Sequence, residues 1–378
     1  MRCPILYFRN IFNHSFFLPF IVESELEQRE VRKIQFTGKS TYILSLPKKW
    51  MEEMHLKAGD QVTLVREANN CLSLIPEAGR KPEHVAEATA ILSPKDSGNT
   101  LRRKVVAMYL AGYRFIHFKL RSGRIQPFQR DAVREIVRRN LVGTEIIADA
   151  SDIITLQVLL SLPELSVSTA IRRMYLIASS MHRDAISSIA EKNTELATAV
   201  ISSDDEVDRF SLYVLRNLVL ALQNGRFLKE IGLRNPSDCL SYRVAVKSIE
   251  RIADHASAIA ERGIKLKEKI PPELFERISK MSILSLSVLG DSVESLLKPD
   301  YQLADKTVDN VEGIYNLEKD ALSLLESSKS VHDGGTLKLI VEDIRRTAEY
   351  ASDIAEAAIN ETIGEVIEGQ STRNTGRR

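Results

Sequence analysis

The sequence is poor in cysteine, in aromatic residues and in long apolar runs, and each shortage excludes a class of protein. Its three cysteines among 378 residues, Cys3, Cys71 and Cys239, lie far apart. They form neither a disulfide framework nor a CxxC zinc knuckle, so a reducing cytoplasm is the expected location. Aromatic residues make up only 6% of the chain, which favours helices over sheets. With 44% hydrophobic and 27% charged residues, the composition indicates a folded, soluble protein of two or three domains.

No apolar run is long enough to insert into a membrane. The first residues, "MRCPILYFRNIFNHSFFLPFIV", are interrupted by polar side chains and stay below the roughly twenty apolar residues that a span needs. The segment also lacks the A-x-A-like cleavage site of a signal peptide. We therefore expect residues 1–28 to be an unstructured extension, and residues 369–378 to be a disordered tail.

The signatures of enzymes are missing as well. The sequence contains no Ser-His-Asp set, no P-loop and no GxGxxG stretch. Its one Glu-x-x-His, from Glu52 to His55, stands alone, whereas helical di-metal enzymes need paired sets. The sequence therefore predicts a protein that is not an enzyme.

The net charge of +1 hides a strong asymmetry along the chain. Residues 29–66 hold eight Lys/Arg against four Asp/Glu, and residues 101–139 hold eleven against two. Residues 184–365 hold twenty-two Lys/Arg against thirty-two Asp/Glu. A basic front suggests a polyanionic partner and an acidic back suggests bound cations, although two such halves can also simply attract each other.

Residues 29–78 are expected to form a small β-rich domain. In "TYILSLPKKWMEEM" a strand passes into a short helix, and Pro47 suits the first helical turn. "LKAGDQVTLVRE" predicts a turn and a strand, which pairs with "CLSLIP" across Asn69-Asn70. Such short elements bury little surface, so we expect a dimer that shares its core.

This order of elements resembles the AbrB-like (SpoVT/AbrB) DNA-binding domain. The residues that carry the resemblance are Gly38, Lys39, Ser40, Ile43, Leu46, Pro47, Lys48, Trp50, Leu56, Gly59, Asp60 and Val62. The resemblance implies an interleaved homodimer of swapped hairpins that binds double-stranded DNA. By position, the DNA-binding candidates, whose charges suit phosphate contacts, are Arg32, Lys33, Lys39, Lys48 and Lys49.

Residues 85–165 are expected to form a short α/β linker region. "TLRRKVVAMYL" predicts a helix that ends near Gly112, and a strand follows it. "PFQRDAVREIVRRNL" predicts an amphipathic helix, and "GTEIIADA" and "IITLQVLL" predict strands. The basic excess of this region could widen a DNA footprint or dock the region onto the acidic back, and the sequence does not decide between the two.

Residues 168–368 are expected to be helical throughout, because apolar residues recur at three- and four-residue spacing between Pro and Gly breaks. "SIERIADHASAIAE" and "EDIRRTAEYASDIAE" share a frame, so the region contains two three-helix repeats, 168–268 and 271–363. The predicted helices are 168–193, 203–231, 239–268, 271–297, 302–328 and 336–363.

The first repeat carries acidic residues four apart on two successive helices. Asp204 and Asp208 form one pair, and Glu250 and Asp254 form the other. Residues at this spacing share a helix face, and carboxylates that meet there repel each other unless they are protonated or neutralised by a cation. One interpretation is a metal site, and the other is an ordinary solvated face.

The two segments that carry these pairs, "DDEVDRFSLYVLRNL" and "SIERIADHASAIAE", resemble PhoU. The chain from about residue 29 resembles the AbrB–PhoU fusion proteins of archaea, the phosphate uptake regulator family. The resemblance implies two tandem three-helix bundles in a protein that connects phosphate transport to gene control. It also implies a multinuclear iron or zinc cluster in the first repeat, held by Asp204, Asp208, Glu250 and Asp254. No other cofactor is expected.

The second repeat departs from this pattern, because three of the four ligand positions are lost. The equivalent residues are Val311, Tyr315, Arg345 and Glu349. The shifted pairs Asp305/Asp309 and Glu349/Asp353 are interpreted as solvated surface. His255 is either a further ligand or a packing residue, because Tyr350 stands at its place in the second copy.

The sequence thus predicts a mainly α protein with a swapped-hairpin β domain, an α/β linker region and two helical bundles. The function that follows is a cytoplasmic, homodimeric DNA-binding transcriptional regulator of phosphate uptake, whose helical domain acts as a sensor or an interaction surface. The alternative is a signalling adaptor that docks a phosphate transporter or a kinase without specific DNA binding.

Overall fold

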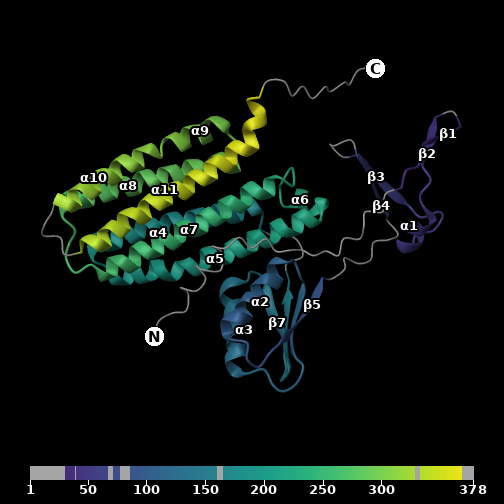
Figure 1. Ribbon diagram of the computed structural model, residues 1–378, viewed down its shortest axis with the longest axis horizontal. Coiled ribbons are helices and arrows are strands. Elements are labelled where there is room, and N and C mark those ends of the chain that lie inside the picture. Colours follow the sequence, from purple (N-terminus) through teal and green to yellow (C-terminus); the bar gives the residue numbers. More distant parts are fainter. Residues whose placement is uncertain are drawn as a thin grey trace. The chain divides into compact units, whose positions relative to one another are not determined.

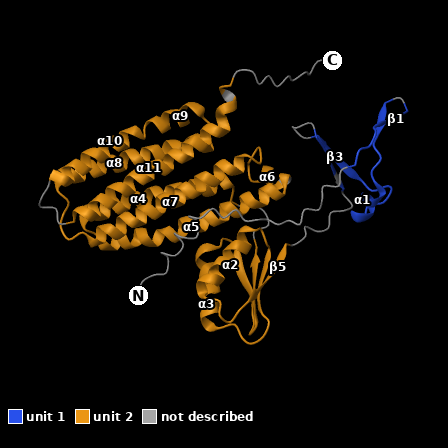
Figure 2. Cartoon of the chain, in the orientation of Figure 1, with its two compact units in different colours: residues 1–84 blue, residues 85–378 orange. Residues whose placement is uncertain are grey.

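The computed structural model describes residues 30–38, 40–66, 71–76, 86–159, 165–327 and 333–367. The chain divides into two compact units, residues 1–84 and residues 85–378 (Figure 2). The expected terminal extension and tail, Lys39 and the Asn69-Asn70 turn lie outside the described residues. Among the residues described, no helix combines the length and the apolar character that crossing a bilayer requires.

The first unit consists of two hairpins and one short helix. β1 (Gln35–Thr37) pairs antiparallel with β2 (Thr41–Ile43), and β3 (Val62–Arg66) pairs antiparallel with β4 (Leu72–Pro76). Between the hairpins lies α1 (Lys48–Glu53), and Pro47 precedes it as the N-cap residue. The turn before β3 needs Gly59, whose φ is +100°, and the Asp60 carboxylate accepts a hydrogen bond of 2.7 Å from the Lys57 amide.

The described part of this unit has almost no buried core. Among its described side chains only Pro47 and Leu56 are buried. Large apolar side chains face solvent instead, among them Val31 at 97%, Tyr42 at 72% and Leu72 at 69% exposure. So much apolar surface in contact with water favours a partner that covers it.

The second unit begins with an α/β region built on one four-stranded sheet of order β5-β6-β8-β7. β5 and β6 are parallel, whereas β8 runs antiparallel to both β6 and β7. The elements are β5 (Glu87–Leu92), α2 (Gly98–Leu110), β6 (Phe115–Leu120), α3 (Pro127–Asn140), β7 (Thr144–Asp149) and β8 (Ile153–Val158). Helices α2 and α3 pack together over one face of the sheet (Figure 1). The sequence analysis found all of them except β5.

The rest of the unit is helical. Repeat one consists of α4 (Val167–Glu191), α5 (Thr194–Gln223) and α7 (Asp238–Lys265), with the short α6 (Gly225–Glu230) between the last two. Repeat two consists of α8 (Pro272–Leu297), α9 (Tyr301–Asp309), α10 (Glu312–Ser327) and α11 (Gly334–Thr362), and ends in the 3₁₀ turn η2 (Ile363–Glu365). A single apolar core runs through both repeats, with α7 packed against α11. The two bundles are therefore one body.

Three helix boundaries differ from those predicted. The helix expected over 203–231 ends at Gln223, and the short α6 follows it as a separate helix. α5 starts at Thr194 rather than at residue 203, because the Asn193 side chain caps it by accepting a 3.0 Å hydrogen bond from the Leu196 amide. The helix expected over 302–328 is broken between α9 and α10 at Asn310-Val311. Asn and the nearby Gly313 are weak helix formers, and the break turns Val311 into the core.

Arg216 of α5 fastens the α/β region to the bundle. Its guanidinium donates hydrogen bonds to the carbonyl oxygens of Tyr109, Gly112 and Tyr113, the latter two at 3.0 Å, and lies over the Tyr109 ring. These carbonyls end α2, so the arginine caps that helix from another element. Arg139 of α3 lies 3.7 Å from Asp205 of α5. The basic α/β region therefore docks onto the acidic bundle, while its contribution to DNA binding stays a prediction.

Candidate functional site

The four predicted metal-binding carboxylates lie on neighbouring helices of repeat one. Asp204 and Asp208 are on α5, and Glu250 and Asp254 are on α7, which packs against α5. All four side chains are partly buried. The (i, i+4) spacing on each helix and the contact between the two helices thus put the acidic residues on one shared face, which we call the acidic face.

The charges on the acidic face affect one another strongly. Burial, followed by the nearby charge of Asp254, raises the pKa of Asp208 to about 7. Burial lowers the pKa of Lys247 to about 8, against the attraction of Asp208 and Asp254. Lys247 also forms an (i, i+3) ion pair with Glu250. The Lys247 ammonium group therefore lies in the field of three of the four carboxylates.

Lys247 was missed in the sequence analysis, although a signal was present. It stands three residues before Glu250, one helical turn away on the same side of α7. A pattern of metal ligands consists of acidic, His or Cys side chains, so it does not include a lysine. A cation placed within an acidic pattern is informative because it tells how the pattern is neutralised.

The side chains as they stand do not form a ready metal site. In the described ranges, no three His, Cys, Asp or Glu side chains are grouped so that they could hold one metal ion. The donor chemistry of four carboxylates suits a hard or borderline cation, but the Lys247 ammonium already supplies positive charge to them. Metal binding by Asp204, Asp208, Glu250 and Asp254 stays a prediction.

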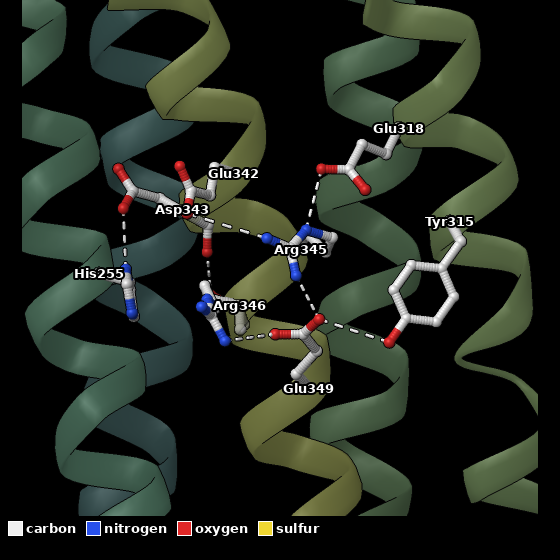
Figure 3. Close-up of polar contacts among 9 residues, drawn as sticks. His255, Tyr315, Glu318, Glu342, Asp343, Arg345, Arg346 and Glu349 are labelled. Carbon is white, nitrogen blue, oxygen red and sulfur yellow. Dashed lines mark hydrogen bonds and ion pairs between the residues drawn. The ribbon is translucent and has the colours of Figure 1, made fainter.

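In repeat two, Arg345 of α11 holds the equivalent face together (Figure 3). Its guanidinium donates a 2.9 Å hydrogen bond from Nε to Glu318 of α10 and pairs with Glu349 one turn further along α11. Arg346 also pairs with Glu349, at 3.0 Å, and Tyr315 Oη donates to the same carboxylate. The change from a carboxylate to Arg345 has thus replaced an acidic face by an ion-pair network.

This network corrects one detail of the sequence analysis. Asp305 and Asp309 are exposed, as predicted. Glu349 is not solvated surface, because its side chain is only 22% exposed and three neighbours bind it. Sequence spacing could not reveal this, since Glu318 comes from α10, a different helix.

The two repeats also carry the same ion pair with opposite polarity. When Ile249 is aligned with Ile344, Lys247 aligns with Glu342 and Glu250 aligns with Arg345. Lys247 pairs with Glu250 in α7, and Glu342 lies 3.8 Å from Arg345 in α11. Each helix therefore keeps an (i, i+3) pair at this level, but the cation and the anion have changed places.

His255 is a packing residue that joins the repeats. Its Nδ1 lies 2.8 Å from Asp343 Oδ1 on α11, and its ring stacks on Tyr350 with the centroids 5.6 Å apart. Asp343 is buried and also pairs with Arg262. The Asp343 carboxylate, shared by His255 and Arg262 of the other repeat, binds α11 to α7, and these contacts support the packing interpretation of His255.

A second histidine, His182 of α4, lies fully buried where three helices meet. Its Nε2 is 3.0 Å from Ser282 Oγ of α8, and its Nδ1 is 3.4 Å from Thr347 Oγ1 of α11. Burial, helped by the charges of His255 and Arg183, lowers the pKa of His182 to about 4. No sequence pattern points to this residue, because both hydroxyl partners come from repeat two.

The predicted DNA-binding residues of the first unit are solvent-exposed where they are described. The side chains of Lys48 and Lys49 are 90% and 73% exposed, and each pairs with the glutamate four residues on in α1, at 3.5 and 3.7 Å. Arg32 pairs with Glu30, and Lys33 is exposed. Exposed pairs of this kind are weak, so they can be exchanged for phosphate contacts. The role of these residues stays a prediction.

Comparison with known protein families finds matches for two regions of the chain. Residues 35–81 match the family "Antidote-toxin recognition MazE, bacterial antitoxin", and residues 171–263 match the PhoU domain. The PhoU match runs from α4 to α7 and contains the whole acidic face of repeat one. Both families are regulatory rather than catalytic.

Individual relatives match about half of the chain. A phosphate-specific transport system accessory protein PhoU homolog from Aquifex aeolicus is 29% identical over 202 residues, which cover 51% of this chain and 87% of that protein. A homolog of the same name from Caulobacter vibrioides is 28% identical over 222 residues, 55% of this chain and 91% of that protein. The crystal structure of PhoU from Pseudomonas aeruginosa aligns with a TM-score of 0.47 at 20% identity, over 52% of this chain and 96% of that one.

Proposed function

Because the chain joins an N-terminal MazE/AbrB-type domain to a C-terminal PhoU domain, we propose that it is a DNA-binding transcriptional regulator of phosphate uptake. The observation that carries the proposal is this pairing in one polypeptide. The first domain is of a type that binds DNA, and the relatives of the second are accessory proteins of phosphate-specific transport. The PhoU domain would act as the sensor or interaction surface, without catalytic activity.

The DNA-binding form would be a homodimer that shares the core of the first unit. The apolar side chains of β1, β2, β3 and β4 supply the surface for it, since Phe36, Tyr42, Leu64 and Leu72 are all more than half exposed in one copy. Swapped hairpins would cover these side chains and bring two sets of basic residues together on one DNA duplex. Two linked sets bind more tightly than one because the second contact forms within the same complex.

Fluorescence anisotropy with the full-length protein tests the proposal. Its affinity for DNA upstream of phosphate transporter genes should exceed that for shuffled DNA of the same length. Lys48→Glu/Lys49→Glu should weaken binding at least tenfold and lower the slope of log K against log salt by about 0.9 for each phosphate that the variant no longer neutralises. The matched control is Lys280→Glu/Lys298→Glu, which alters two lysines that form the same kind of exposed (i, i+4) pair outside the first unit.

The alternative function, an adaptor that docks a transporter or a kinase, makes the opposite prediction. Equal affinity for upstream and shuffled DNA, together with no effect of Lys48→Glu/Lys49→Glu, would rule out specific DNA binding. The adaptor would then be the better description of the chain.

The proposed iron or zinc cluster on the acidic face needs its own test. Metal analysis of the protein as purified should find iron or zinc, and Glu250→Ala/Asp254→Ala should lower the content. Equal metal in the two proteins would contradict the proposal. Asp305→Ala/Asp309→Ala serves as the control, because it removes an exposed (i, i+4) acidic pair of repeat two.

A further inference from the structure

Lys247 differs from the other lysines of the bundle that form ion pairs. Its side chain is only 15% exposed and that of its partner Glu250 only 16%, whereas the paired Lys280, Lys298 and Lys338 are at least half exposed. A lysine is rarely withdrawn from water unless anions surround it. Here they do, since Lys247 faces Glu250 on its own helix and experiences the charges of Asp208 and Asp254.

Repeat two shows what a resident cation does at this level of the bundle. Arg345 satisfies Glu318 and Glu349 at once and, with them, links α10 to α11. Its side chain is 19% exposed, close to the value for Lys247. The ion pair has opposite polarity in the two repeats, but each repeat has one cation among its carboxylates.

We propose that Lys247 is the resident cation of the acidic face in repeat one, and that a metal ion binds there only by displacing its ammonium group. The carboxylates are the same for both cations, and two positive charges held against them would repel each other. An ammonium group on a flexible four-carbon stem can leave for solvent, whereas the guanidinium of Arg345 is fixed by several partners. The cation of repeat one can thus be exchanged for a metal ion, whereas Arg345 stays in place in repeat two.

The inference rests on the proposed cation site of the acidic face and is independent of DNA binding. In the described ranges the carboxylates form no ready metal site, and Lys247 is a cation that the structure shows paired with one of them. The face stays neutralised by Lys247 until a cation of higher charge replaces it. Metal affinity should therefore rise when Lys247 is removed, the opposite of what the loss of a ligand does.

Calorimetric titration of the full-length protein with Zn²⁺ alone tests this. Lys247→Met keeps the apolar stem and removes the charge, so it should bind Zn²⁺ at least tenfold more tightly than the wild type. Adding Asp254→Asn to Lys247→Met should abolish the gain. Lys247→Arg should bind no more tightly than the wild type, and Lys280→Met, which removes an exposed paired lysine, should match it.

A melting measurement gives a second readout and shows whether the variants are folded. Without metal, Lys247→Met should melt below the wild type, because carboxylates on a partly buried face lose their counter-charge. Zn²⁺ should raise its melting temperature more than that of the wild type. Lys247→Gln, a milder change, provides the same comparison where Lys247→Met does not fold.

Equal Zn²⁺ affinity of Lys247→Met and the wild type, including no binding by either, overturns the inference. Its failure is distinguishable from that of the metal proposal. Tightly held metal in the purified wild type that Lys247→Met leaves unchanged would support the metal proposal and defeat the inference. Metal-free purified wild type together with tight Zn²⁺ binding by Lys247→Met would support the inference and contradict the metal proposal.

Discussion

Helices α7 and α11 are two copies of one element that share part of their buried face and differ in their charged residues. The shared part includes the aligned pairs Ile249/Ile344, Ala253/Ala348 and Ile259/Ile354, which are completely buried in both. Their charged residues differ, because Lys247 and Glu250 of α7 correspond to Glu342 and Arg345 of α11. The comparison teaches that shared apolar residues can keep two helices packed alike while a few partly buried charges give each copy a different electrostatic face.

The largest effect should come from forcing α11 to resemble α7. Arg345→Glu restores a carboxylate at that position but leaves Glu318, Glu342 and Glu349 without their shared cation. Breaking a largely buried pair and adding a like charge should lower the free energy of unfolding by about 4 kcal/mol. Urea denaturation followed by circular dichroism measures the loss, and a loss below about 1 kcal/mol would show that the network is not structural.

The next effect concerns the junction between the repeats, at His182. The pKa of His182 lies near 4 in the folded protein and near 6.5 when unfolded, so only the unfolded state binds its proton between these values. Stability should be complete above pH 6.5 and should fall as the pH drops towards 4, by roughly 3 kcal/mol. Denaturation midpoints of the wild type and His182→Gln, compared at pH 7.5 and pH 4.5, isolate this contribution. An equal loss in both proteins would contradict it.

The reversed polarity can be tested by exchanging the charges in repeat two. Glu342→Lys/Arg345→Glu gives α11 the Lys-x-x-Glu order of α7. The double variant should recover about 1 kcal/mol of what Arg345→Glu loses, because the new lysine can pair with the new glutamate one turn away. Recovery is measured as the coupling energy of a double-mutant cycle, with Glu342→Lys as the fourth member. A coupling energy of zero would mean that residues 342 and 345 do not interact and that the ion pair contributes nothing.

The smallest effect should follow from removing the second arginine of the network. Arg346 pairs with Glu349 at 3.0 Å, but its side chain is 45% exposed. Such a pair contributes little because water screens it, so Arg346→Ala should change stability by less than about 1 kcal/mol. The same urea titration as for Arg345→Glu measures the change. Similar losses of unfolding free energy in the two variants would show that Arg346 matters as much as Arg345.

The sequence predicted those parts of the molecule that depend on local pattern. Helices α4, α7, α8 and α11 follow from apolar spacing and from Pro and Gly breaks, and the loss of the acidic pattern at Arg345 is visible by aligning two helices. The break at Asn310 and strand β5 were missed, because tertiary packing decides both. The contact of Glu349 with Tyr315 and the hydroxyl partners of His182 join different helices, so no spacing along the sequence reveals them. The ion pair of Lys247 with Glu250 is local, and its (i, i+3) spacing could have revealed it.

The contact of Arg216 has a mechanical consequence. Asp208 and Arg216 are eight residues apart on the same helix, α5, so about 12 Å of continuous helix separates the acidic face from the carbonyls that end α2. No loop lies between them that could absorb a displacement. A rotation or tilt of α5 at the acidic face is therefore expected to move the α/β region that Arg216 holds.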